Sequence, residues 1–132
     1  HDTCRRQRQM CIRDSPGTAD APYDFFAIDY WPCKYTEGAD PVALRDAQAK
    51  FAMEHYGHGA EGGFRFIYPT SGGPRGDGPD FWISAAAPGI AARGSNIDIF
   101  RSKSYGSEAE QERWNHMTCD NSSTWVGWRL HN

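Results

Sequence analysis

No stretch of the sequence approaches the roughly 18 consecutive apolar residues that a membrane-spanning helix needs. An excess of positive charge is also missing, because 14 Lys and Arg stand against 17 Asp and Glu, for a formal net charge of -3. A general nucleic-acid binder would be basic. With 39% hydrophobic and 23% charged residues, the composition is that of a globular protein. We therefore expect no membrane span and no nucleic-acid partner.

Familiar catalytic motifs are absent as well. The sequence contains no nucleophile elbow, no P-loop, no HExxH zinc motif and no CxxC pair. These absences favour a non-catalytic protein without a cofactor, although an enzyme that needs no such motif remains an alternative.

The first segment differs from the rest of the chain. Residues 4–15 resemble a peptide produced by translating sequencing-adapter DNA; the alternative is a genuine basic arm. Ser15–Pro22, rich in Pro, Gly and Ala, is typical of a linker. Without residues 1–15 the formal charge becomes -5. The sequence thus predicts an artefact or disordered arm with its linker over residues 1–22, and one domain over residues 23–132.

The pattern of apolar residues predicts four strands and two helical regions. Alternating aromatic and apolar residues are typical of strands, whereas an acid followed by Pro, as at Asp40 and Pro41, is typical of a helix start. Gly57 and Gly59 should end that helix. The second helical region should begin at Pro88, break near Gly94 and near Tyr105–Gly106, and restart at a capping box, Ser107–Glu110, to run to about Met117. The predicted strands cover Tyr23–Tyr35, Gly63–Thr70, Asp80–Ala87 and Ser123–Leu130, with Ser71–Pro79 as a loop.

This order of strand, helix, strand, strand, helix and strand is the ferredoxin-like βαββαβ pattern of the α+β class. It predicts a four-stranded antiparallel sheet with two helices on one face, which leaves the other face open. In the first strand we expect Phe26, Ile28 and Tyr30 to face the core and Trp31 to lie on the open face. An open aromatic face on a domain of this size usually finds a partner.

Short motifs add a resemblance to known proteins. Cys33–Gly38 closes the first strand, Phe81–Ser84 leads to Ala87–Pro88, and Thr118–Cys119 opens the last strand. This pattern resembles small exported marine bacterial proteins of unassigned activity. In fold order the chain also resembles the dimeric α/β-barrel superfamily, which includes antibiotic-biosynthesis monooxygenases and small polyketide cyclases. Those relatives imply a dimer, but a shared fold does not give a function.

Two cysteines fall where the predicted strands meet. Cys33 ends the first strand and Cys119 begins the last, and these strands are antiparallel neighbours in a ferredoxin-like sheet. Because Cys4 and Cys11 lie in the suspect segment, we predict a disulfide between Cys33 and Cys119. It would be either a structural bond of an exported protein, periplasmic or extracellular, or a redox pair.

The histidines offer weak metal and catalytic candidates. His55 and His58, three residues apart near a helix end, can share a metal if Glu54 or Glu61 supplies a third ligand. Two solvated histidines at a helix C-terminus are the favoured interpretation, so no metal site is predicted. His116 can act as a general base or simply pack on the surface.

Three tryptophans, Trp31, Trp82 and Trp125, are the candidates for the open sheet face. They would either stack on a sugar or another flat ligand or form an interface between protein chains, where Trp and Tyr are enriched. The interface is the favoured interpretation.

Three functional hypotheses follow. The first is a non-catalytic exported domain that self-associates or assembles into a larger complex through its aromatic sheet face. The second is a small cofactor-free enzyme acting on an aromatic or polyketide-like molecule in a pocket between helices and sheet, with His116, Tyr30 and Tyr68 as acid–base groups. The third is carbohydrate or flat-ligand binding through Trp31, Trp82 and Trp125.

Overall fold

The computed structural model describes residues 25–71, 76 and 78–128. The predicted segment 1–22, its cysteines and Leu130 at the end of the last strand lie outside these residues. The elements are β1 (Phe25–Tyr35), α1 (Pro41–Gly57), β2 (Gly63–Ile67), β3 (Phe81–Ala87), α2 (Ile90–Ile99), a π-helical turn (Phe100–Ser104), α3 (Glu108–Glu112), a 3-10 turn (Arg113–Asn115), β4 (Met117–Cys119) and β5 (Ser123–Trp128).

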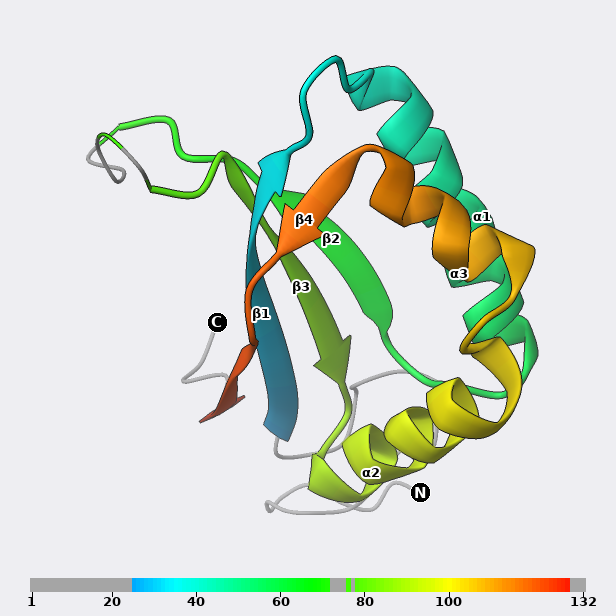
Figure 1. Ribbon diagram of the computed structural model, residues 1–132. Coiled ribbons are helices and arrows are strands. Elements are labelled where there is room, and N and C mark those ends of the chain that lie inside the picture. Colours follow the sequence, from blue (N-terminus) through cyan, green and yellow to red (C-terminus); the bar gives the residue numbers. More distant parts are fainter. Residues whose placement is uncertain (1–24, 72–75, 77, 129–132) are drawn as a thin grey trace.

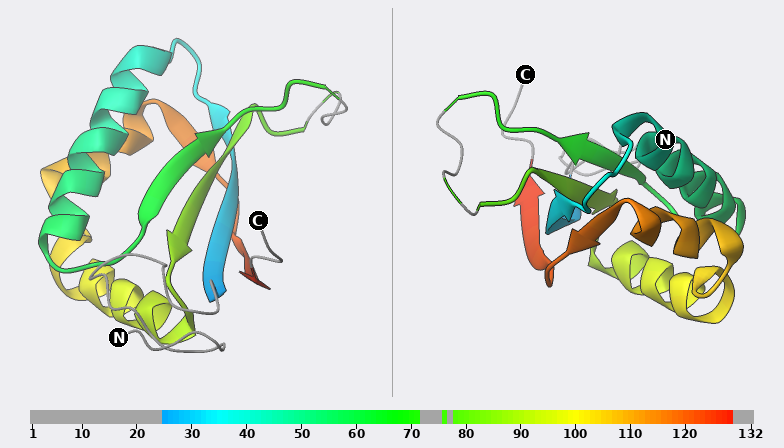
Figure 2. Two further views of the ribbon diagram at one scale, coloured as in Figure 1. Left: turned by 180° about the vertical axis from the view of Figure 1, so that it is seen from behind. Right: turned by 45° about the horizontal axis from the view of Figure 1, so that its top comes forward.

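The strands form one antiparallel sheet in the order β2-β3-β1-β4, and β5 also pairs with β1. The helices cover one face of this sheet and leave the other face free of helices, as Figures 1 and 2 show from three sides. The fold is therefore the α+β, ferredoxin-like arrangement that the sequence predicts. The last strand differs from the prediction, because β4 pairs with the end of β1 and β5 with its beginning.

Local signals determine where α1 begins. The Asp40 carboxylate accepts a hydrogen bond of 2.9 Å from the Val42 amide, and Pro41 occupies the first turn. At the other end Gly59 has a φ of +105°, a conformation that L side chains rarely adopt. Leu44 and Phe51 are buried against the sheet. Burying one such side chain stabilises the fold by about 2 kcal/mol.

The second helical region breaks near Tyr105–Gly106 as predicted but not at Gly94. α2 continues through Gly94, where helix hydrogen bonding outweighs the roughly 1 kcal/mol penalty of glycine. A π-helical turn follows, in which the Tyr105 amide donates to the Phe100 carbonyl over 2.7 Å. The predicted helix start at Ser107 is confirmed, since Glu110 N donates to Ser107 Oγ over 3.1 Å. The reciprocal bond of a capping box is not formed, because the Glu110 carboxylate accepts from the Gly106 amide and the Ser107 amide donates to the Ser104 carbonyl.

The orientation of β1 corrects the expected core face. Ala27 and Cys33 are buried on the helix-covered face, and Trp31 shares that face by alternation. Phe26, Ile28 and Tyr30 therefore belong to the open face, opposite to the prediction. Alternation shows which residues share a face but does not show which face the helices cover.

The core surrounds the predicted disulfide. Cys33 and Cys119 are direct partners in the register of β1 and β4, with their Cα atoms 4.0 Å apart, and their sulfurs are bonded. The prediction of this bond is confirmed. Fully or almost fully buried side chains from β1, α1, β3 and β4 make up the core cluster: Cys33, Leu44, Phe81, Ile83 and Met117.

Among the residues that the structure describes, no helix is both long and apolar enough to cross a membrane.

Candidate functional site

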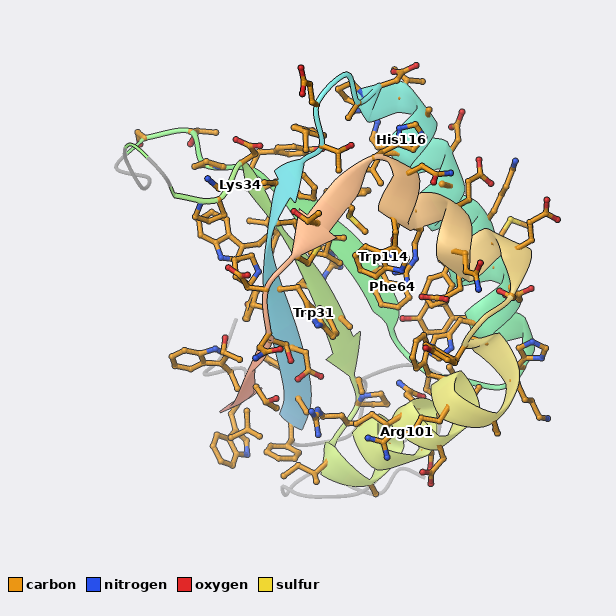
Figure 3. The ribbon with its side chains drawn as sticks, in the orientation of Figure 1. Trp31, Lys34, Phe64, Arg101, Trp114 and His116 are labelled. Carbon is orange, nitrogen blue, oxygen red and sulfur yellow. A yellow bond between two sulfur atoms is a disulfide. The ribbon has the colours of Figure 1, made fainter. Side chains whose placement is uncertain are left out.

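A cavity of about 250 Å³ lies between the helices and the covered face of the sheet. Small side chains on β3 leave this space, because Ala85 stands between Asp29 of β1 and Phe64 of β2 in the sheet register. Figure 3 shows Trp31, Phe64 and Trp114 in this region. The volume exceeds the 150 Å³ or so of a cavity that holds benzene and is just below the usual range for ligand pockets, about 300–1,000 Å³. The cavity is lined by Asp29, Trp31, Phe51, His55, Tyr56, Phe64, Ile83, Ala85, Ala86, Ala87, Arg93, Asn96, Ile97, Phe100, Arg113, Trp114, Met117 and Cys119.

His55 is the titratable base of this cavity. It comes from the last turns of α1, is only 4% exposed, and stacks on Phe51 with ring centroids 5.5 Å apart. Burial lowers the pKa of its imidazole, and the positive charges of His58 and Arg113 lower it further. The ring is therefore neutral at pH 7 and can accept a proton.

A π-helical turn orients the His55 ring. Ser104, fully buried at the end of that turn, has its Oγ 3.1 Å from His55 Nδ1. Phe100, at the start of the same turn, lies edge-on to the His55 ring. When Nδ1 carries the proton and donates to Ser104, Nε2 is the basic atom, and it has no hydrogen-bond partner among the described residues. Single π-helical turns of this kind occur frequently at functional sites.

Tyr56 supplies a proton donor next to His55 in the cavity wall. Burial raises the pKa of its phenol to about 12. The hydroxyl therefore stays protonated at neutral pH and can donate a hydrogen bond to a ligand oxygen.

A buried carboxylate, Asp29, also lines the cavity. Asp29 is bound by Arg93 of α2 through Nε, at 2.8 Å, and through Nη2, at 3.0 Å, and it also accepts a hydrogen bond from Thr124 Oγ1. Asn96 adds a second link, since its side chain exchanges two hydrogen bonds with the backbone of Glu61. These contacts hold α2, which has no buried residue, over the cavity.

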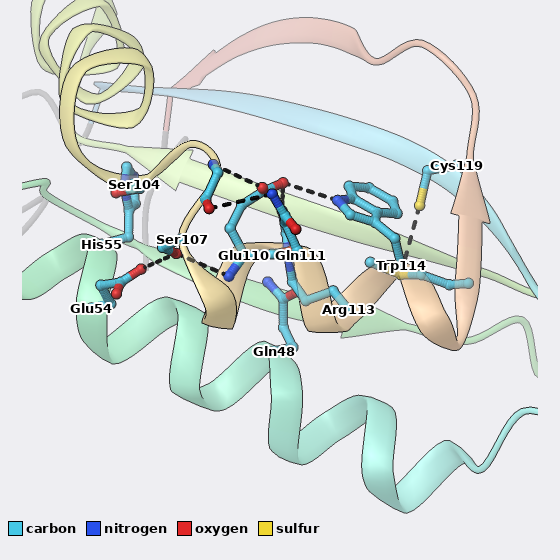
Figure 4. A network of polar contacts seen from close by, with 12 residues as sticks. Gln48, Glu54, His55, Ser104, Ser107, Glu110, Gln111, Arg113, Trp114 and Cys119 are labelled. Carbon is cyan, nitrogen blue, oxygen red and sulfur yellow. Dashed lines mark hydrogen bonds and ion pairs between the residues drawn. The ribbon is translucent and has the colours of Figure 1, made fainter.

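A second ion pair closes the wall formed by α3 and the following 3-10 turn (Figure 4). Arg113 is buried, lies 3.9 Å above the Phe51 ring and donates to Glu110 Oε2 over 3.1 Å. Trp114 Nε1 donates to the same oxygen over 2.9 Å. Burial alone would raise the pKa of Glu110, but hydrogen bonds from Trp114, Gly106 and Arg113 outweigh it and lower that pKa. The carboxylate thus remains charged and paired.

The predicted acid–base residues lie elsewhere. Tyr30 is on the open face, Tyr68 follows β2 and contacts Phe81, and His116 lies beyond the 3-10 turn, where its carbonyl accepts from the Thr36 amide. Figure 3 places His116 away from Phe64 and Trp31. The structure does not bring these three side chains together, and none of them lines the cavity.

The three predicted tryptophans separate in the same way. Trp31 lines the cavity, which corrects its expected place on the open face. Trp82 and Trp125 do lie on the open face, where they line a shallow hollow of about 340 Å³ together with Tyr30, Ile67 and Ser123.

The weak metal candidates do not form a cluster. His58 caps the exposed C-terminal end of α1, whereas the His55 ring is buried and hydrogen-bonded to Ser104. Within residues 25–71, 76 and 78–128, no three His, Cys, Asp or Glu side chains are grouped closely enough to hold a metal ion.

Sequence reasoning missed most of this site. His55 entered only as a metal candidate, and Asp29, Tyr56, Arg93 and Arg113 did not enter at all. One signal was available, because a lone acid such as Asp29 in an otherwise apolar strand is unusual unless it is paired.

No known protein-family model and no curated protein matches the sequence. Among solved structures, similar chains share 4–16% sequence identity with this one. SnoaB, a cofactor-independent oxygenase from Streptomyces nogalater, has 10% identity and a TM-score of 0.43, over 82% of this chain and 94% of its own. A dimeric ferredoxin-like protein of unknown function from Bacteroides fragilis has 4% identity and a TM-score of 0.42, over 80% and 96%.

A chlorite dismutase-like protein has 16% identity and a TM-score of 0.44 over 80% of this chain, which spans only 44% of that protein's length. These likenesses concern the fold alone.

Proposed function

We propose that the chain is a small cofactor-free enzyme that binds a flat, mostly apolar molecule in the cavity and exchanges a proton with it through His55. The aromatic lining supports this proposal, because Phe51, Phe64 and Phe100 surround the imidazole with centroids 5.5 to 6.4 Å from it. Pockets with apolar walls and a few polar groups are typical small-molecule sites. The substrate class is an aromatic or polyketide-like molecule with an acidic C–H or O–H bond.

The single observation that carries the proposal is a neutral, buried histidine with an oriented ring beside an empty volume. In the proton-transfer step, His55 Nε2 takes a proton from the bound molecule, which becomes an enolate or phenolate, and later returns it. Tyr56 donates a hydrogen bond to the oxygen on which negative charge develops. Such positioned acid–base groups accelerate reactions by about 10²–10⁴-fold.

Exchange of an acidic C–H with deuterated water tests this step without knowledge of the natural substrate. The probe is 2-tetralone, a neutral bicyclic ketone with acidic hydrogens beside its carbonyl, followed by NMR. We expect the protein to exceed the same concentration of free imidazole by at least about 100-fold, and His55→Gln to lose this excess. His116→Gln is the matched control and should retain it. Exchange no faster than with imidazole contradicts the proposal.

The cavity itself is tested by filling it. Ala85→Leu places a large side chain at a position where the cavity wall has only a methyl group, and it should abolish both 2-tetralone binding and exchange. Ser104→Ala, which removes only the orienting hydroxyl, should lower the exchange rate while binding remains. If Ala85→Leu binds and exchanges like the wild type, the reaction takes place elsewhere.

A second function, compatible with the first, is favoured by the open face. We propose that the chain self-associates there, because Trp125 is 61% exposed beside Trp82, Tyr30 and Ile67. Burying such aromatic groups between two copies would remove apolar surface from water. Export remains part of the proposal, supported by the bond between Cys33 and Cys119, since disulfides persist mainly in oxidising compartments.

A further inference from the structure

The charges that surround the cavity occur as two closed pairs. Arg93 donates to Asp29 through Nε and Nη2, and Arg113 donates to Glu110 over 3.1 Å. Arg113 also donates to the Glu110 carbonyl and to Gln48 Oε1. The two arginines therefore each have a carboxylate partner from the protein, and the four charges sum to zero around a neutral imidazole.

Asp29 is not required by the architecture of the sheet. It sits in the middle of β1 with Ala85 and Thr124 as its register partners, positions where an apolar residue would pack well. A buried ion pair contributes little net stability, because removing both charges from water offsets their attraction. Besides linking α2 to the sheet, Asp29 occupies Nε and Nη2 of Arg93, a cation in the cavity wall.

The consequence concerns the charge of the ligand. A carboxylate that entered the cavity would lose its hydration without meeting an unpaired cation, which is costly. An uncharged molecule avoids this cost and still finds the Tyr56 hydroxyl as a donor in the wall. Negative charge that forms on the ligand during proton transfer is matched at once by the imidazolium of His55.

We propose that Asp29 is a specificity-determining residue: by occupying Arg93 it makes the cavity selective for uncharged ligands and against carboxylates. This inference rests on the proposed function, because it requires that ligands bind in this cavity. It goes further by assigning the ligand's charge and the residue that selects it.

Three probes of nearly equal size separate charge from shape. At about pH 7.5, 2-naphthol and 2-naphthamide are neutral, whereas 2-naphthoate carries a full negative charge. Isothermal titration calorimetry should show both neutral probes binding the wild-type protein at least about tenfold more tightly than 2-naphthoate. This comparison needs no variant, so it does not depend on whether a substituted protein folds.

Asp29→Asn then tests the residue itself, because asparagine keeps the shape and removes only the charge. Arg93 becomes an uncompensated cation, and we expect the affinity for 2-naphthoate to rise about tenfold while that for 2-naphthamide changes less than about threefold. Asp98→Asn is the matched control on the exposed surface of α2 and should change neither. If Asp29 only held α2 in place, its substitution would weaken all three probes alike.

The outcomes are distinguishable. Equal binding of 2-naphthoate and 2-naphthamide to the wild type overturns the inference and leaves the binding cavity intact. Folded Asp29→Asn protein without a gain for 2-naphthoate overturns the role of Asp29. Failure of all three probes to bind overturns the proposed function, and the inference with it.

Discussion

The two faces of the sheet differ in how they treat polar groups. On the helix-covered side, Asp29 of the sheet and His55 and Arg113 of the covering helical segments have defined partners, although the cavity walls are otherwise mostly apolar. The open face gathers Trp82 and Trp125 around a shallow hollow. Buried polar groups need partners, and a site that holds them can direct chemistry, whereas exposed aromatic surface favours association. The comparison is the basis for proposing chemistry at the covered face and contact between chains at the open face.

The largest expected effect is a difference between the two faces in how much a substitution lowers the free energy of unfolding. Replacing Cys33 and Cys119 together by alanine should lower the free energy of unfolding by about 4 kcal/mol, because the bond closes a loop across a sequence separation of 86. Trp125→Ala on the open face should change it by less than about 0.5 kcal/mol. Urea denaturation of the oxidised proteins measures both. A loss below about 1 kcal/mol in the double variant would show that the covered face does not depend on this bond.

Substitutions on the open face should instead weaken the association between two copies of the chain. Trp125→Asp is expected to raise the dissociation constant of the dimer by about 30-fold, near 2 kcal/mol, because it places a charge among desolvated aromatic side chains. Met53→Asp, an equally drastic change at an exposed site on α1, should leave it unaltered. Sedimentation velocity over a wide concentration range gives both constants. A wild-type protein that stays monomeric at the highest concentration contradicts self-association.

A smaller effect distinguishes the covered face by pH. Burial lowers the pKa of His55 in the folded state below its ordinary value of 6.5. As pH falls below about 6.5, the His55 imidazole becomes protonated in the unfolded chain while it stays neutral in the folded protein. The free energy of unfolding therefore falls by at most about 1.4 kcal/mol per pH unit. The contribution of Glu110, whose pKa is also lowered, begins only near pH 4.5 and below.

Chemical denaturation at several values between pH 7.5 and 5.5 measures this slope. His55→Gln should flatten it, whereas His116→Gln should preserve it. An unchanged slope in His55→Gln would mean that the buried imidazole is not the group responsible.

Features encoded by neighbouring residues could be predicted from the sequence. The Asp40–Pro41 helix start and the Ser107 helix start are local patterns, and both N-cap hydrogen bonds are present. The pairing of Cys33 with Cys119 was predicted from strand order, because the ferredoxin-like topology places the C-terminal strand beside the first, although Cys119 lies in the separate short strand β4. Topology thus extended local signals to one long-range contact.

The candidate site could not be predicted in this way. Asp29 made its face of β1 look polar, and only Arg93, 64 residues later, neutralises it. The orientation of His55 depends on Ser104, which a π-helical turn brings into place from 49 residues away. Such contacts depend on the position and rotation of each helix on the sheet. The periodicity of apolar residues does not specify these.

The most direct test of the central claim is an NMR titration of the labelled protein with 2-naphthol. Binding on the covered face predicts the largest amide shifts at Ala85, Phe64 and Tyr56, with Trp82 and Trp125 little affected. It also predicts that Ala85→Leu removes these shifts. Shifts confined to the open face, or unchanged by Ala85→Leu, would contradict the assignment of the binding site to the cavity between helices and sheet.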